Sequence, residues 1–279
     1  MKKIAITGSS GFVGKYMISI LKDSKYEIIE LDLDKGYDVT KLESLNLLID
    51  VDFIIHFASR SSVIESFKNP AEYYFTNYIM TLNVLECARR MNSKVIYFSS
   101  YIYGTPVYLP IDELHPINPH NPYAQSKLIC EKLCEGYNRD FGLDILVFRP
   151  FNIYGKGQNS AFLLPSIVKQ SLTGIITLND PRPKRDFIHV LDVVKAVKNA
   201  IELSPSGYCV FNLGFGKSYS ISELVEIMSD IIGDKLSIKY TNQYRKGEVM
   251  NTVASNSRAK KILNWEPKVD IRDGLRQML

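Results

Sequence analysis

Two side chains four residues apart, the phenol of Tyr123 and the ammonium of Lys127, have the types and spacing of an acid–base pair. On a helix, residues i and i+4 lie on the same face, so the two groups would be neighbours. A phenol has an ordinary pKa of about 10 and is a poor proton carrier near neutral pH. A lysine cation beside it stabilises the phenolate and lowers that pKa. The pair therefore predicts proton transfer to and from a substrate hydroxyl.

The same spacing recurs at Tyr37 and Lys41, so the spacing alone does not identify the site. Position separates the two pairs. Tyr123 opens an expected helix, and the serine pair Ser99-Ser100 ends the preceding expected strand, at the sheet edge where α/β proteins bind ligands. Tyr37 follows the second strand, near the adenine end expected for a dinucleotide. We therefore assign the chemistry to Tyr123, Lys127 and a hydroxyl from the serine pair.

A glycine-rich turn lies between the first expected strand and the first expected helix. Gly8, Gly11 and Gly14 have a GxxGxxG spacing, which lets the backbone approach a pyrophosphate at a helix N-terminus. Asp32 closes the second strand, where a carboxylate accepts the adenosine ribose hydroxyls and repels a 2′-phosphate. NAD is therefore expected over NADP, although Lys35 could partly offset the repulsion.

Apolar β-rich runs alternate with helical patterns through the first half of the chain. Strands are expected near 3–7, 27–32, 53–57, 94–99 and 144–149, and helices near 11–21, 71–91 and 123–141. This rhythm predicts a Rossmann-type doubly wound parallel sheet in an α/β protein. We expect a NAD-binding domain over residues 1–150. A smaller sugar-nucleotide-binding α/β part follows over 151–279, packed on the first with possible interleaving of strands and helices, and with the substrate cleft between them.

The composition favours a cytoplasmic enzyme. The 279 residues carry 34 basic and 30 acidic side chains without the basic clusters of a nucleic-acid-binding arm. The N-terminal residues lead into the glycine-rich turn without the apolar stretch of a signal peptide, and no segment has the length of a membrane helix. The four cysteines form no CxxC pair, which favours reduced thiols, and the four histidines show no metal-ligand pattern.

These motifs together resemble the extended short-chain dehydrogenase/reductases, and within them the NAD-dependent epimerase/dehydratase family of UDP-galactose 4-epimerase. The resemblance covers nearly the whole chain. It rests on segments 7–14, 56–58, 99–104, 121–127, 149–155, 185–190 and 263–265. It implies a homodimer formed by the helices near 71–91 and 123–141.

The resemblance implies roles for individual residues. Tyr123 is the acid–base, Lys127 tunes it and holds the nicotinamide ribose, and a serine hydroxyl bonds the sugar oxygen. Counting back four residues from Tyr103 selects Ser99, whereas counting outward along the strand selects Ser100. The implied cofactor residues are Gly8, Ser10, Gly11, Phe12, Val13, Gly14, Asp32, Asp38, Val39, Phe57, Ala58, Asn77, Tyr123, Lys127 and Phe151; Asn152, Arg185 and Arg245, with Ser100, are implied on the substrate side.

The family oxidises and reduces nucleotide sugars, usually at C4, and two departures narrow the reaction. The 4,6-dehydratases carry an Asp-Glu pair after their active-site threonine, whereas Tyr101 and Ile102 follow the serines here, so dehydration is not expected. The short path from Asp32 to Asp38 is similar to that of 4-keto-6-deoxysugar reductases. The segments around His56, Asn77 and Arg185 are more similar to 4-epimerases. We expect a nucleotide-sugar 4-epimerase, with the NAD(P)H-dependent 4-keto reductase as the alternative and a non-catalytic NAD-binding sensor as a remote one.

Overall fold

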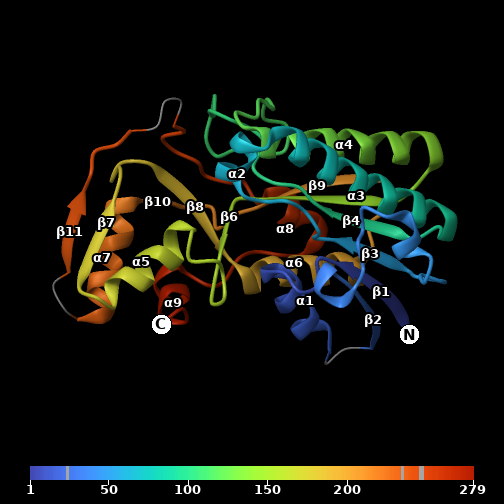
Figure 1. Cartoon of the computed structure of the whole chain (residues 1–279), viewed down its shortest axis with the longest axis horizontal. Coiled ribbons are helices and arrows are strands. Elements are labelled where there is room, and N and C mark those ends of the chain that lie inside the picture. Colours follow the sequence, from blue (N-terminus) through green and yellow to red (C-terminus); the bar gives the residue numbers. More distant parts are fainter. Residues whose placement is uncertain (23–24, 234–235, 245–247) are drawn as a thin grey trace.

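The computed structural model describes residues 1–22, 25–233, 236–244 and 248–279. Its largest element is a six-stranded parallel sheet in the order β2-β1-β3-β4-β5-β9 (Figure 1). Its strands are β2 (Tyr26–Leu31), β1 (Lys2–Thr7), β3 (Phe53–His56), β4 (Lys94–Phe98), β5 (Ile145–Pro150) and β9 (Tyr208–Leu213). The doubly wound α/β fold expected from the sequence is confirmed.

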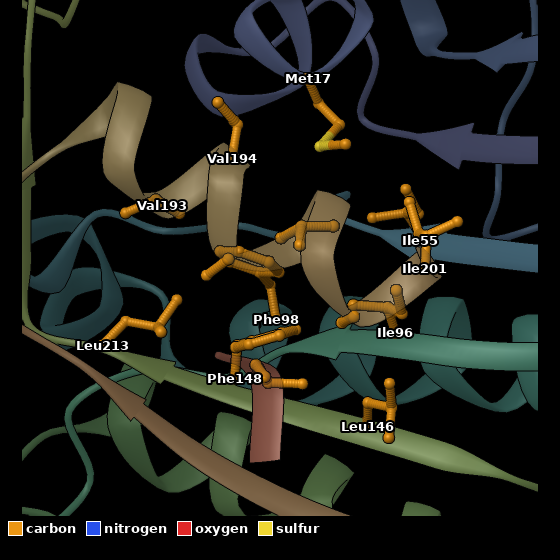
Figure 2. Close-up of a cluster of buried hydrophobic side chains, with 14 of the residues drawn as sticks. Met17, Ile55, Ile96, Phe98, Leu146, Phe148, Val193, Val194, Ile201 and Leu213 are labelled. Carbon is orange, nitrogen blue, oxygen red and sulfur yellow. The ribbon is translucent and has the colours of Figure 1, made fainter. Parts of the chain in front are cut away.

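Helices cover both faces of this sheet because its strands are apolar on both sides. On one face lie α1 (Phe12–Lys22), α6 (Val190–Leu203) and α8 (Ser257–Leu263); on the other lie α3 (Pro70–Met91) and α4 (Pro122–Phe141), with the short α2 (Val63–Lys68) beside them. Figure 2 shows Met17 of α1 and Val194 of α6 on the side of the sheet from which Phe98 projects. Each such side chain, once fully buried, contributes roughly 1.5–3 kcal/mol.

The connection from β2 to β3 is short. Within residues 32–52 the structure has two 3-10 turns, η1 (Leu33–Lys35) and η2 (Leu42–Leu45), and no strand. The sheet therefore begins at β2, and the chain leaves β1 toward β2 on one side and reaches β3 on the other. Such a reversal of strand order opens a crevice at the carboxyl ends of the strands, here beside β1. The glycine-rich turn follows β1 directly.

The rest of the chain builds two small sheets beside the first. The strands of these sheets are β6 (Asn152–Tyr154), β8 (Lys184–His189) and β10 (Ser218–Ser220) in one, and β7 (Ile175–Leu178) and β11 (Ser237–Tyr240) in the other. Helices α5 (Leu163–Ser171), α7 (Ile221–Ile232) and α9 (Ile271–Arg276) pack around their own apolar core. No helix in the described residues is long and apolar enough to cross a membrane.

Strand β9 and helix α6 come after residue 150 but belong to the large sheet and its cover. Strand β9 pairs in parallel with β5 over its full length, from Tyr208 to Leu213. The two halves of the sequence are thus interleaved, and residue 150 does not separate two independent sheets.

Candidate active site

Tyr123 and Lys127 lie on the first two turns of α4. The helix begins cleanly because the Asn121 side chain accepts a hydrogen bond from the Ala124 N–H at 2.8 Å, and Pro122 occupies the first helical position. The helical spacing expected for the pair is therefore present. The competing pair, Tyr37 and Lys41, lies outside any α-helix, and Lys41 forms an ion pair with Asp38 at 3.7 Å.

The two serines after β4 have different surroundings. Ser99 is buried, its N–H donates to the Phe148 carbonyl at 2.8 Å, and its hydroxyl has no partner in the described part of the chain. The Ser100 side chain instead interacts with the Tyr123 phenol and lowers the pKa of that phenol. Successive residues of an extended chain point to opposite sides, which is why only one serine reaches the phenol. The structure therefore selects Ser100 as the neighbour of Tyr123.

Burial governs the protonation of this pair. Burial raises the pKa of Tyr123, and the hydrogen bond with Ser100 only partly offsets the increase. The sequence-based expectation that Lys127 lowers the pKa of Tyr123 is thus wrong, because burial is the larger effect and raises that pKa. Lys127 itself is 2% exposed, with its ammonium 4.7 Å from the centre of the Tyr97 ring, and burial lowers its pKa to about 8.

His56 lies at the end of β3 and links three elements beneath the site. Its Nδ1 is 2.7 Å from the Thr7 hydroxyl, and its Nε2 is 3.3 Å from the Thr81 hydroxyl. Burial, reinforced by the charge of Lys127, lowers the pKa of His56 to about 3. The ring is therefore neutral and serves to join β1, β3 and α3.

Asn77 is not placed as the sequence predicted. Its side-chain oxygen accepts from the Arg60 N–H at 2.8 Å, and its amide donates to the Arg60 carbonyl and the Ser126 hydroxyl at 3.2 and 2.9 Å. The side chain is 2% exposed. Asn77 thus fastens the loop after β3 to α4, next to Lys127, instead of presenting its amide to the groove.

The glycine-rich turn fits a dinucleotide. Gly8 has φ +73°, and a Cβ there would lie 2.6 Å from the Ala58 nitrogen; a Cβ on Gly14 would lie 2.3 Å from the Gly8 carbonyl oxygen. The turn is therefore tight, and α1 begins immediately behind it at Phe12, where the first N–H groups of a helix have no partner within the helix. These features match the chemistry of a bound pyrophosphate.

Asp32 lies beside this turn, and one of its oxygens accepts from the Ser10 N–H at 3.0 Å. The other oxygen accepts from the Asp34 N–H at 3.2 Å. A carboxylate has about four acceptor positions, so two remain for ribose hydroxyls. Lys35, considered as a partner for a 2′-phosphate, is instead paired with Glu30 at 2.8 Å.

The remaining cofactor candidates follow the carboxyl edge of the sheet. Asp38 accepts from the Thr40 N–H and hydroxyl, which lowers the pKa of Asp38, and the carbonyl of buried Val39 accepts from Asn83 at 3.0 Å. Phe57 packs on Phe98 with ring centres 4.5 Å apart, and the Ala58 N–H donates to the Thr7 carbonyl. Phe151 is buried against Tyr101.

The substrate-side candidates lie in the second half. The Asn152 amide donates to the Asp186 carbonyl at 3.0 Å, joining β6 to β8. The Arg185 guanidinium contacts the Glu248 carboxylate and the carbonyls of Lys184 and Val249. Arg245 lies outside the described residues. The sequence did not lead us to predict Glu248 as the partner of Arg185. The one local indication was an acidic residue three positions after Arg245.

The sequence model of the NAD dependent epimerase/dehydratase family matches residues 4–214 of the chain. This chain belongs to that family. The match spans the glycine-rich turn, Ser100, Tyr123, Lys127 and Arg185.

Individual relatives of this epimerase/dehydratase family member have different activities. The chain is 32% identical to UDP-glucose 4-epimerase of Halalkalibacterium halodurans, over 95% of this chain and 90% of that protein. It is 33% identical to GDP-6-deoxy-D-mannose reductase of Pseudomonas aeruginosa, over 100% of this chain and 96% of that protein.

Two solved structures of family members superpose closely. UDP-glucose 4-epimerase from Thermotoga maritima with UDP-glucose has a TM-score of 0.92 at 28% identity, covering 99% of this chain and 97% of that one. RMD from Pseudomonas aeruginosa complexed with NADPH has a TM-score of 0.91 at 32% identity, covering 100% and 98%. The chain is therefore a nucleotide-sugar enzyme of the epimerase/reductase type with an NAD-type cofactor.

Proposed function

We propose that the chain is a nucleotide-sugar 4-epimerase that acts on a UDP-hexose through a 4-keto sugar. The observation that carries the proposal is the placement of Tyr123 and Lys127 one turn apart at the start of α4, with Ser100 beside the phenol and the glycine-rich turn following β1 in the same sheet. Tyr101 and Ile102 follow Ser100, so no carboxylate is available there for the elimination of water.

The chain's own groups have distinct tasks in this proposal. Ser100 orients the sugar C4 oxygen, and Tyr123 takes the hydroxyl proton during oxidation and returns it during reduction. The dinucleotide, held by residues 8–14 and Asp32, supplies hydride acceptance and return at C4. The interaction with Ser100 lowers the pKa of Tyr123 and counteracts part of the increase due to burial.

The diphosphate of the substrate is assigned to Arg185. A guanidinium matches phosphate oxygens with two parallel hydrogen bonds. Glu248 occupies part of this guanidinium, so we expect a diphosphate to compete with that carboxylate for Arg185. The epimerase relative and the structural neighbour with UDP-glucose support UDP as the nucleotide.

The direct test is incubation of the purified chain and NAD with UDP-glucose, UDP-galactose and their N-acetyl counterparts, followed by chromatographic separation. Interconversion of one pair without net NADH is the expected result. Tyr123→Phe should retain NADH binding and lose conversion. Absence of conversion for every pair would remove the epimerase proposal.

A 4-keto reductase is the second candidate, favoured by the strand-free connection between β2 and β3 and by the GDP-6-deoxy-D-mannose reductase relative. It predicts one NAD(P)H consumed per 4-keto sugar nucleotide, measured as loss of absorbance at the nicotinamide band. Unchanged absorbance across UDP-, dTDP- and GDP-linked 4-keto sugars would exclude it.

For the cofactor we propose NAD over NADP. Asp32 repels a 2′-phosphate, and Lys35 is already paired with Glu30. Titration with NADH and NADPH should show tighter binding of NADH, and Asp32→Ala should narrow the difference. Tighter NADPH binding by the unmodified chain would contradict this assignment and favour the reductase.

A further inference from the structure

A short segment of the second half lies against the first turn of α1. We call residues 155–158, which follow β6, the strap. The Tyr16 hydroxyl of α1 donates to the Lys156 carbonyl at 2.9 Å, and Tyr16 packs edge-on against Phe12 with ring centres 5.7 Å apart. Within the strap, the Gln158 amide donates back to the Ile153 carbonyl at 2.8 Å. The strap is thereby held on the helix that begins at the glycine-rich turn.

Gly155 brings two helix N-termini together. A Cβ built on it would lie 2.7 Å from Cγ1 of Val190 and 3.4 Å from Cζ of Phe12. These are the first residues of α6 and α1, which are 14 and 11 residues long. Each helix N-terminus carries a partial positive charge and free N–H groups, so the strap lies where two such ends converge.

His189 supplies a buried donor at the same place. It is 1% exposed, and its Nε2 would lie 3.4 Å from the Cβ built on Gly155. Its Nδ1 accepts from the Leu191 N–H at 3.4 Å, so the proton of the neutral ring is on Nε2. Nε2 has no partner in the described part of the chain. A buried donor without an acceptor is costly, which indicates that a ligand or water oxygen completes it.

Lys156 adds a full positive charge. Its side chain is exposed, and its ammonium forms no ion pair with any residue that the structure describes. The Tyr16 hydroxyl holds the Lys156 backbone, so the lysine side chain starts from a point anchored on α1. Two helix N-termini and one buried donor thus converge at the strap, and the strap carries a lysine.

We propose that the strap is the outer wall of the cofactor pyrophosphate site, with Lys156 providing its cation and His189 Nε2–H donating to a phosphate oxygen directly or through one water. This inference rests on the cofactor site assigned under the proposed function. It adds two residues from the second half of the sequence to a site whose other phosphate-binding groups come from residues 8–14.

The test measures binding, independent of turnover. Lys156→Gln removes the charge at an exposed position; Lys169→Gln, on the exposed side of α5, is the matched control with the same loss of charge. Binding of ADP-ribose is measured by calorimetry at several salt concentrations, and adenosine serves as the ligand without pyrophosphate. We expect Lys156→Gln to weaken ADP-ribose about five- to tenfold and to flatten the salt dependence of its Kd, and to leave adenosine unchanged.

His189→Asn tests the second residue, because asparagine can still cap α6 but lacks the donor at Nε2. ADP-ribose should bind this variant several-fold more weakly than the unmodified chain. If Lys156→Gln and Lys169→Gln both bind ADP-ribose with the Kd of the unmodified chain, the strap proposal is overturned and the proposed function stands. If the unmodified chain binds neither ADP-ribose nor NADH, the proposed function and the strap proposal both fail.

Discussion

Ser100 and Ser99 are adjacent, yet their hydroxyls differ: the Ser99 hydroxyl has no partner in the described part of the chain, whereas Ser100 interacts with the phenol of Tyr123. The interaction with Ser100 lowers the pKa of Tyr123 against the effect of burial. The phenol must lose its proton before it can accept the proton of the sugar hydroxyl during oxidation. Removing the Ser100 hydroxyl should therefore change the pH at which catalysis begins, as well as its rate.

We predict that Ser100→Ala raises the pKa of Tyr123, so that the acidic limb of the kcat–pH profile moves to higher pH. Loss of a single positioned hydrogen bond should also lower kcat by roughly 10- to 1000-fold. The profile is measured in the direction of sugar oxidation between about pH 6 and 10. Ser99→Ala is the control and should leave the position of the acidic limb unchanged. An identical profile for Ser100→Ala and the unmodified enzyme would contradict the role of Ser100.

Lys127 is a buried cation that forms no ion pair within the described part of the chain. Its charge therefore lowers the stability of the folded chain, although the proposed function requires it. Its pKa is about 8 in the folded chain against an ordinary value near 10.5. Below pH 8 the Lys127 amine is protonated in both the folded and the unfolded chain, and the folded chain bears the full free-energy cost of burying the charge. Between pH 8 and 10.5 the unfolded state binds more protons, so stability rises with pH.

We therefore predict that Lys127→Met, which keeps the apolar stem, raises the free energy of unfolding at pH 7 by roughly 2–3 kcal/mol while abolishing turnover. The gain should shrink as the pH approaches 10. Denaturant unfolding of both proteins at pH 7 and 9.5 measures this. If Lys127→Met were less stable than the unmodified chain at pH 7, the buried charge of Lys127 would not destabilise the fold.

At the scale of elements, helix α4 is fastened to the sheet by one buried ion pair. The Arg149 guanidinium of β5 donates to both oxygens of Glu131, to Oε1 at 3.0 Å and to Oε2 at 2.6 Å, one turn beyond Lys127 on α4. Arg149 also donates to the Tyr103 hydroxyl at 3.0 Å, and Tyr103 donates to Asn212 of β9 at 2.6 Å. The catalytic helix, the loop after β4 and two strands thus share one polar network.

Glu131→Gln should remove the charge that balances buried Arg149 and destabilise the chain by roughly 3–5 kcal/mol. The matched control is Glu135→Gln on the same helix, whose partner Lys132 is 67% exposed and whose loss should cost under about 1 kcal/mol. Denaturant unfolding compares the two. Equal losses of stability would show that the buried pair has no special part in fastening α4.

The elements were predictable from the sequence where a local pattern determines them. Alternation of apolar runs located β1, β3, β4 and β5, and the Asn121-Pro122 start fixed the beginning of α4. What stayed hidden depends on partners distant in sequence. Asn77 bonds Arg60 and Ser126, and the Trp265 indole donates to the Asp192 carbonyl, pairings that no local spacing encodes. The same reason explains why β9 was not placed beside β5.

At the scale of the whole molecule, β8, which carries Arg185, and β6, which precedes the strap, form a small sheet beside the large one (Figure 1). A buried carboxylate helps to hold this arrangement. Asp186, next to Arg185, accepts from the N–H groups of Phe215, Gly216 and Ala254 at 2.6–2.9 Å. The strand that carries Arg185 is therefore held by the segment that follows β9, so a strand of the large sheet leads directly into the contacts that position a small sheet.

The outer surface of α3 carries an apolar stripe directed away from its own core. Phe75 is 67% exposed and Tyr78 is 37% exposed, and Leu82 continues the i, i+3, i+7 spacing as a partly exposed residue. Helices α3 and α4 lie side by side at one edge of the molecule (Figure 1). Two such helix pairs meeting across a twofold axis would bury the stripe on itself, and a stable interface of this kind covers about 800 Å² per partner.

We predict a homodimer through α3 and α4, with a mass about twice the 31.8 kDa of the chain. Phe75→Glu would place a charge against its own symmetry copy and should convert the dimer to monomer at micromolar concentration. Leu172→Glu is the control, because Leu172 is 71% exposed but lies after α5, away from the stripe. Sedimentation velocity distinguishes the species. An unmodified chain that sedimented as a monomer would refute the dimer. The stripe flanks the helix that carries Tyr123 and Lys127. A Phe75→Glu monomer with full stability and full turnover would therefore show that the stripe serves association alone.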